Sequence, residues 1–225
     1  MLRTLYHGST TIMRTPRPGY GNDWNDFGPG FYCTDSYEHA ALWASGHGRD
    51  GFVNTYMLDD KGLRTVDLSS PGYCILHWLA VLLNYREFDT LSPLAYQARD
   101  YIRTAFAVDH RECDCILGWR ADNIHFAFAQ DFLNEDISYQ QLRDAVRLSG
   151  LGRQTVLKSS RALGRLLFTG YESVKNIMQY PVRISGERNE LSSYCREIYR
   201  KKDPSGLYIS TIMLENIQEY DPRLR

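Results

Sequence analysis

One segment, Asp26–Ala44, constrains the fold of this 225-residue chain more than any other stretch. It opens with Gly28-Pro29-Gly30, which predicts a tight turn because glycine tolerates positive φ and proline fixes φ. Phe31–Thr34 follows, an aromatic and β-branched run typical of a short strand. Asp35 or Ser36 then offers a side-chain oxygen as the N-cap of a helix. A turn, a strand and a capped helix in so few residues form a rigid ledge.

Two aromatic side chains of this ledge, Tyr32 on the strand and Trp43 on the helix, reach the same side of it. A rigid surface that carries two rings suits the binding of a flat ring. Each residue taken alone also has a structural explanation, since such side chains commonly pack in a core. The same holds for His7 at the end of a strand and for Gln154 within one.

Composition indicates a folded globular protein, with 43% hydrophobic and 24% charged residues. The net charge of −1 provides no overall attraction to nucleic acid or to an anionic membrane. The five cysteines are odd in number and include no CxxC pair, which argues against a disulfide framework or a structural zinc site. No apolar run is long enough to span a membrane, and the N-terminus lacks a signal-peptide hydrophobic region. We therefore expect a cytoplasmic protein with reduced thiols, no bound metal and no membrane partner.

Hydrophobic patterning predicts short strands interspersed with helices. Strands are expected over residues 2–6, 31–34, 52–58, 63–68, 113–119 and 154–158. Helices are expected over residues 37–44, 73–85, 94–106, 124–133, 139–148, 160–166, 190–202 and 210–218. Because these elements do not alternate regularly as βαβ units, the pattern favours an α+β fold.

Three motifs taken together resemble the ADP-ribosyltransferase superfamily, in the branch shared by diphtheria-type toxins and poly(ADP-ribose) polymerases. The first motif is a strand that ends in aromatic-His-Gly-Ser/Thr, matched by Tyr6-His7-Gly8-Ser9. The second is a Phe-Gly-x-Gly-aromatic-Tyr strand before a helix with an aromatic residue, matched by Phe27–Tyr32 and Trp43. The third is a late strand that presents Glu or Gln, matched by Gln154 in Gly152–Leu157.

The chain is most similar to small stand-alone bacterial and phage members of this superfamily. These share the HGS motif, a DFGxGFYxT segment before an Ala-rich helix with Trp, and a strand–Gly–x–x–Ala–Asp segment matched by Cys115–Asn123. They finish with a Gln-x-Val-x-Lys strand, matched by Gln154–Lys158. Many such proteins look like toxins encoded beside a small antitoxin.

The resemblance implies a split antiparallel β-sandwich core with inserted helices. It places a catalytic domain at residues 1–170 and a helical C-terminal extension, packed on the same domain, at residues 171–225. The implied activity is mono-ADP-ribosyl transfer from NAD, as substrate, to a macromolecular acceptor, protein or RNA, with release of nicotinamide. A toxin or phage-defence role with a cognate antitoxin follows from the same resemblance. Two alternatives remain: an NAD glycohydrolase, and an inactive module that binds NAD or ADP-ribose.

The resemblance also implies roles for single residues. His7, Tyr32 and Gln154 are the expected catalytic residues. The expected NAD contacts are His7, Gly8, Ser9, Gly30, Phe31, Tyr32, Ala40 and Trp43. Gly8 would present its backbone to the nicotinamide carboxamide because it has no side chain, and Ala40 stands where polymerases often have a serine.

Gln154 would bind the hydroxyl of the nicotinamide ribose through a neutral amide. A glutamate there would add a negative charge, so the glutamine favours transfer of a single ADP-ribose over chain elongation. Asp122 is a candidate for an assisting carboxylate, and its alternative role is a turn residue before a helix.

Basic residues suggest how the pyrophosphate and the acceptor are bound. We expect Arg14, Arg17 and Arg49 near the NAD pyrophosphate. A basic rim is expected around the Gln154 strand, formed by Arg143, Arg147, Arg153, Lys158, Arg161 and Arg165. Such a rim would suit a nucleic-acid acceptor, and the alternative is a solvated, ion-paired helix face.

Overall fold

The computed structural model describes residues 1–17, 19, 21–45, 49–89, 92–121, 123–148, 152–175, 197 and 203–225. The described part contains seven strands, which form one mixed sheet. Helices lie between and after these strands along the chain, so the predicted α+β class is confirmed. The described residues fall into two compact units. One comprises those within Met1–Asp67, Asp109–Gly118 and Leu151–Ile184, and the other comprises the rest.

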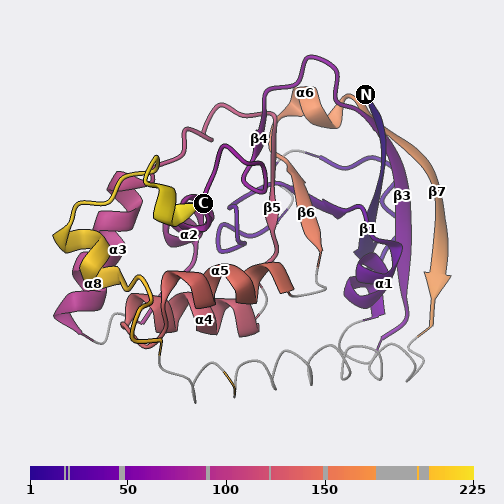
Figure 1. Ribbon diagram of the computed structural model, residues 1–225. Helices are drawn as coiled ribbons and strands as arrows, with labels where there is room; N and C mark the ends of the chain where they lie inside the picture. Colours follow the sequence, from indigo (N-terminus) through magenta and orange to yellow (C-terminus); the bar gives the residue numbers. More distant parts are fainter. Residues whose placement is uncertain are drawn as a thin grey trace. The chain divides into compact units, whose positions relative to one another are not determined.

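The sheet belongs to the first unit, with strand order β4-β5-β6-β2-β1-β3-β7 (Figure 1). Its strands are β1 (Leu2–Ser9), β2 (Phe31–Thr34), β3 (Gly51–Asp59), β4 (Thr65–Asp67), β5 (Cys115–Trp119), β6 (Arg153–Leu157) and β7 (Leu166–Val174). The β4–β5 pair is parallel, whereas the β6–β2, β2–β1, β1–β3 and β3–β7 pairs are antiparallel.

Side-chain alternation gives this sheet two different faces. On one face Leu5, Phe31 and Tyr56 are almost fully buried and form a hydrophobic cluster with Leu58 and Leu157. The opposite face is covered by helix α1 (Tyr37–Ser45), which lies beside β1 and β3 in Figure 1.

Helix α1 packs unusually close to the sheet because small residues meet at the contact. Ala40, Ala41 and Ala44 are buried on the helix side. On the strand side, a Cβ at Gly8 would lie 1.8 Å from the carbonyl oxygen of Ala40, and one at Gly51 would lie 2.0 Å from that of Ala44. Only glycine therefore allows the helix backbone to rest on these two strands.

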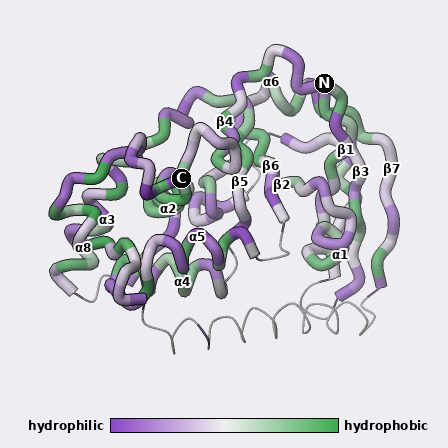
Figure 2. The backbone as a smooth tube through the Cα atoms, in the orientation of Figure 1, coloured by the Kyte–Doolittle hydropathy of each residue, from purple (hydrophilic) through white to green (hydrophobic). Residues whose placement is uncertain are grey.

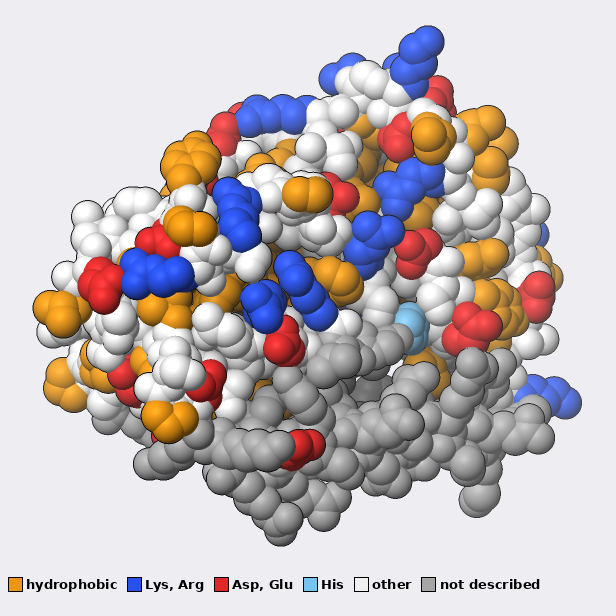
Figure 3. Space-filling view, in the orientation of Figure 1, with side chains coloured by type: hydrophobic (Ala, Val, Ile, Leu, Met, Phe, Trp, Pro, Cys, Tyr) orange, Lys and Arg blue, Asp and Glu red, His pale blue; other side chains and the backbone are white. Residues whose placement is uncertain are grey.

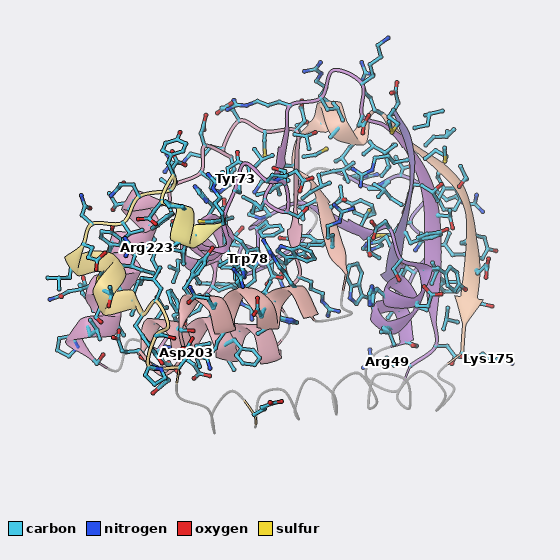
Figure 4. The ribbon with its side chains drawn as sticks, in the orientation of Figure 1. Arg49, Tyr73, Trp78, Lys175, Asp203 and Arg223 are labelled. Carbon is cyan, nitrogen blue, oxygen red and sulfur yellow. The ribbon has the colours of Figure 1, made fainter. Side chains whose placement is uncertain are left out.

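The second unit is helical, with α2 (Ile75–Tyr85), α3 (Pro93–Ala105), α4 (Asn123–Leu133), α5 (Tyr139–Leu148), α8 (Ile209–Leu214) and the 3-10 helix η2 (Pro222–Leu224). Nine residues of α2 are buried, and its hydrophobic colouring in Figure 2 agrees with this. Trp78 on α2, labelled in Figure 4, is fully buried and donates its indole N–H to the carbonyl oxygen of Trp119 at 2.8 Å.

Side-chain caps begin three helices, and the cap at Ser36 confirms a prediction. Ser36 Oγ accepts the backbone N–H of His39 at 3.2 Å at the start of α1. Ser138 does the same for Gln141 at 3.3 Å, and the Gln141 side chain returns a bond to the Ser138 N–H, which completes a capping box. Ser159 caps α6 (Ser160–Leu163).

The segment after β6 differs from the predicted secondary structure. The helix expected through residue 166 ends at Leu163, and the unpredicted edge strand β7 begins at Leu166. Most of β7 is exposed or half-buried, so its hydrophobic signal is weak. The expected boundary after residue 170 falls inside this strand.

Other predicted elements differ only in length or lie outside the described residues. The strand expected over 63–68 is limited to Thr65–Asp67, and the last helix ends at Leu214 rather than at residue 218. Apart from Glu197, the helix expected over 190–202 lies outside the described residues.

Two further expectations concern membranes and metals. No helix in the described ranges is both long and apolar enough to cross a membrane. Within the same ranges, no three or more His, Cys, Asp or Glu side chains gather into a group that could hold a metal ion.

Candidate functional site

The three motifs meet in one row of the sheet. Thr34 at the end of β2 pairs with Tyr6 of β1 on one side and with Gln154 of β6 on the other. His7 follows Tyr6 directly, and Tyr32 pairs with Val156. Residues far apart in the sequence, from the first motif to the third, therefore lie on three adjacent strands.

The β1–β2 edge is only partly closed. Every residue of β1 from Leu2 to Ser9 pairs with β3, but Tyr6↔Thr34 is the one β1–β2 pair within the described residues. Beyond Tyr6 the backbone edge of β1 that faces β2 has no strand partner among those residues. We call this segment, His7–Ser9, the open edge.

His7 bridges the start of the open edge. Its Nδ1 lies 2.7 Å from the carbonyl oxygen of Tyr32. A carbonyl oxygen only accepts, so Nδ1 carries the proton and Nε2 is the acceptor in the neutral ring. The ring also packs at 4.4 Å between centroids against Phe31. Burial lowers the pKa of His7, an effect that the bond to Tyr32 opposes in part, so the ring is neutral near pH 7.

Asn54 of the neighbouring strand β3 is hydrogen-bonded to the open edge, and this role was not predicted from the sequence. The residue is fully buried, and its Nδ2 donates to the carbonyl oxygens of His7 and Thr11 and to Ser9 Oγ, each at 3.2 Å. Its Oδ1 accepts the N–H of Met13 at 2.8 Å. One amide thus fixes the end of β1 to the loop that follows.

Tyr32 is anchored through its hydroxyl. The hydroxyl donates to the carbonyl oxygen of Gly28 at 2.7 Å and accepts the N–H of Phe27 at 3.0 Å. Gly28 has a φ of +72°, a conformation that favours glycine. The turn and the ring therefore hold each other in place, which makes the predicted ledge rigid.

Gln154 is buried beside a carboxylate. The side chain is 3% exposed, and its Nε2 donates to Oδ2 of Asp26, itself 7% exposed, at 2.9 Å. No role for Asp26 was predicted, because 128 positions separate the two residues. The available signal was its place directly before the Phe27-Gly28 turn. Asp122, the predicted assisting carboxylate, lies outside the described residues.

The remaining predicted NAD contacts occupy different environments. Phe31 is 1% exposed and lies behind His7, and Ala40 is fully buried against β1. The Ser9 hydroxyl is engaged with Thr11 and Asn54. Gly30 abuts β6, where an added Cβ would lie 2.4 Å from Val156 Cγ1.

Trp43 is half-buried on α1. Strand alternation directs Tyr32 and Gln154 toward the sheet face that α1 covers, as it does Tyr6, whose ring meets Tyr37 of α1 edge-on at 5.7 Å. His7 points to the opposite face, with Leu5. The expected catalytic residues therefore lie on three adjacent strands, β1, β2 and β6, with His7 on one face of the sheet and Tyr32 and Gln154 on the other.

Most residues of the expected basic rim are engaged locally. Arg153 pairs with Asp35 at 3.7 Å, Arg161 with Asp114 at 3.5 Å and Arg165 with Asp59 at 3.2 Å. Lys158 Nζ donates to the carbonyl oxygen of Phe27 at 2.6 Å, and burial lowers its pKa. Arg143 and Arg147 belong to the second unit. Basic and acidic side chains are interspersed in Figure 3.

The three arginines expected near the NAD pyrophosphate occupy separate positions. The Arg14 guanidinium lies over Phe168 at 5.3 Å, on β7, and β7 is two strands from β1 in the sheet order. Arg49 precedes β3 at the end where Gly51 pairs with Val174, near Lys175 in Figure 4. Arg17 lies in the loop after β1.

Buried thiols near the site are poor nucleophiles. Burial raises the pKa of Cys115 to about 12 and that of Cys33 well above its usual range.

In a comparison with known families, residues 3–168 match the model of a family described as "Protein of unknown function (DUF3990)". Searches of curated proteins and of solved structures found no match. The matched span includes the open edge, the ledge and the Gln154 strand.

Proposed function

We propose that this chain, which belongs to the DUF3990 family, is an NAD-dependent mono-ADP-ribosyltransferase. It would cleave the nicotinamide–ribose bond of NAD and transfer ADP-ribose to a macromolecular acceptor, protein or nucleic acid. The observation that carries the proposal is the row Tyr6–Thr34–Gln154 across β1, β2 and β6. It brings together the three motifs on which the resemblance rests.

The open edge also supports a finer description of the fold. β1 and β3 pair over eight positions and β2 and β6 over four, whereas β1 and β2 share a single pair. A sheet with so weak a junction approaches two sheets that splay apart. We propose on this ground the split β-sandwich of the ADP-ribosyltransferases.

The chemistry of NAD cleavage fits the donors and acceptors at this junction. Loss of nicotinamide passes through an oxocarbenium-like state, as in glycoside cleavage. The backbone of Gly8 offers a paired N–H and C=O to the nicotinamide carboxamide. His7 Nε2 offers an acceptor to a ribose hydroxyl, and the anchored ring of Tyr32 offers a stacking surface. Gln154 offers its amide oxygen to a hydroxyl of the nicotinamide ribose.

A neutral glutamine suits a single transfer. It provides a hydrogen bond to the ribose but no negative charge of its own. A glutamate at the same position would form a charge-assisted bond worth about 1.5–3 kcal/mol. We infer that the enzyme adds one ADP-ribose per acceptor site and relies on the acceptor's own reactivity or on another carboxylate.

The direct test is incubation of the purified protein with NAD, alone and with a cell lysate, while free nicotinamide is measured. Release that requires the lysate supports transfer. Equal release without lysate indicates an NAD glycohydrolase. Saturable NAD binding without release, unchanged in Gln154→Ala, indicates an inactive NAD-binding module and overturns the proposal.

The catalytic assignment is tested with His7→Ala and Tyr32→Ala. Each should lower the rate of transfer roughly tenfold or more while the protein remains folded. Tyr96→Ala, on an exposed position of α3, is a control that should keep the wild-type rate. Wild-type rates in folded His7 and Tyr32 variants would refute the site.

The acceptor is identified with labelled NAD in the same lysate. After the reaction one half is treated with protease and the other with nuclease. Loss of macromolecular label with protease alone indicates a protein acceptor, and loss with nuclease alone indicates a nucleic acid.

A further inference from the structure

The pair formed by Asp26 and Gln154 is a buried carboxylate–amide contact that joins the predicted ledge to the Gln154 strand. Both side chains are more than nine-tenths buried, and 2.9 Å separates Gln154 Nε2 from Asp26 Oδ2. A buried carboxylate is costly unless it is hydrogen-bonded. Asp26 meets this requirement through Gln154, the residue expected to bind the ribose, so the two side chains depend on each other.

The contact determines the orientation of the amide. The NH₂ group of Gln154 faces Asp26, because Nε2 donates to a carboxylate oxygen, Oδ2, that accepts. The amide oxygen then points away from Asp26 and is the atom presented to a bound ribose hydroxyl. A neutral amide at position 26 can donate as well as accept, so the Gln154 amide could adopt either of two orientations. In one of them Gln154 would present its NH₂ donor, rather than its oxygen, to the ribose.

Asp26 itself is held in place by the turn that follows it. The neighbouring Phe27 is fully buried, its N–H bonds to the Tyr32 hydroxyl, and its carbonyl oxygen accepts from Lys158 Nζ. The carboxylate therefore sits on backbone that is fixed from both β2 and β6.

We propose that Asp26 is a positioning residue that orients the Gln154 amide and supplies, through it, the negative charge that a glutamate at position 154 would carry. This inference rests on the proposed function. It makes the catalytic unit a pair from two motifs, in which Gln154 contacts the ribose and Asp26 acts behind it.

The test is a double-mutant cycle with wild type, Asp26→Asn, Gln154→Ala and the double variant. Nicotinamide release is measured at varied NAD, with folding checked by circular dichroism. Asp26→Asn should lower kcat about tenfold in the wild-type background, with KM within about threefold. In the Gln154→Ala background it should have no further effect, because residues that act as a unit are non-additive. If each substitution instead lowers kcat by its own factor and the two factors multiply in the double variant, the proposal is overturned.

A matched control is Asp35→Asn, which removes a carboxylate at the far end of β2 that pairs with Arg153. It should leave kcat unchanged. An equal loss in this variant would show that any nearby carboxylate matters and would overturn a specific role for Asp26.

A second readout does not depend on turnover. In the wild-type protein, the side-chain amide signal of Gln154, assigned by its loss in Gln154→Ala, should show protons protected from solvent exchange. Asp26→Asn should weaken that protection, because the variant's side-chain oxygen accepts from the Gln154 amide in one of its two orientations only. Unprotected protons in the wild-type protein would refute the contact even if Asp26→Asn does not fold. Absence of NAD cleavage by a protein with protected protons would instead refute the proposed function alone.

Discussion

Gly8 shows how a single residue links the fold to the proposed site. The sequence motif predicts a glycine for close approach to a ligand. The structure adds a second reason, because the position of a Cβ at Gly8 is already occupied by the carbonyl oxygen of Ala40 and the N–H of Ala44. These are backbone atoms, so no side-chain rotation relieves the clash.

We predict that Gly8→Ala destabilises the protein by about 1–3 kcal/mol, since helix α1 must move away from the sheet. Gly170→Ala on β7 is the matched control, because no atom lies within 4 Å of its added Cβ. Urea unfolding of both variants measures the difference. Equal unfolding midpoints would contradict the packing of α1 described above.

His7 gives the protein a defined pH dependence. Burial lowers its pKa in the folded state, so on acidification the unfolded chain takes up the proton first. The stability contributed by His7 is therefore complete above its unfolded pKa of about 6.5 and is lost as pH falls toward the folded value.

The check is a comparison of wild type with His7→Asn, whose Nδ2 can still donate to Tyr32. Wild-type stability relative to this variant should decrease as the pH of urea unfolding is lowered from 7 to 5. A difference that stays constant or grows would show that His7 is not neutral in the folded protein.

At the level of elements, the loop after β1 depends on one amide of β3. Asn54→Ala removes bonds to the loop and to the end of β1 at once, and it leaves the N–H of half-buried Met13 without its Asn54 acceptor. We predict a loss of about 1–3 kcal/mol in unfolding free energy. Asn84→Ala, at an exposed position of α2, should cost less than about 0.5 kcal/mol. Thermal unfolding of the wild type and the two variants measures these losses of unfolding free energy, and equal losses in the two variants would contradict the prediction.

The strand β7 illustrates what pattern reading misses at this level. Its register with β3 shifts at Thr55/Tyr56, it contains Gly170, and several of its side chains are exposed. An edge strand gains its stability from backbone pairing with one neighbour, so its sequence need not alternate.

For the whole molecule, the proposed activity predicts toxicity. Expression in bacteria should arrest growth as NAD is consumed or an essential acceptor is modified, and Gln154→Ala should relieve the arrest. Growth curves at matched protein levels provide the measurement. Equal growth of cells that make either protein would argue against a toxin role.

The α+β class and most of the strands and helices follow from local sequence patterns, because hydrophobic periodicity, glycine turns and N-caps act over a few residues. The three motifs are visible in the sequence as well. The row that Thr34 forms with Tyr6 and Gln154, and the contact of Asp26 with Gln154, appear only in the folded chain. Such pairings join distant segments through strand register and burial, and neither is encoded in a local pattern. The edge strand β7 and the Asn54 anchor required the fold for the same reason.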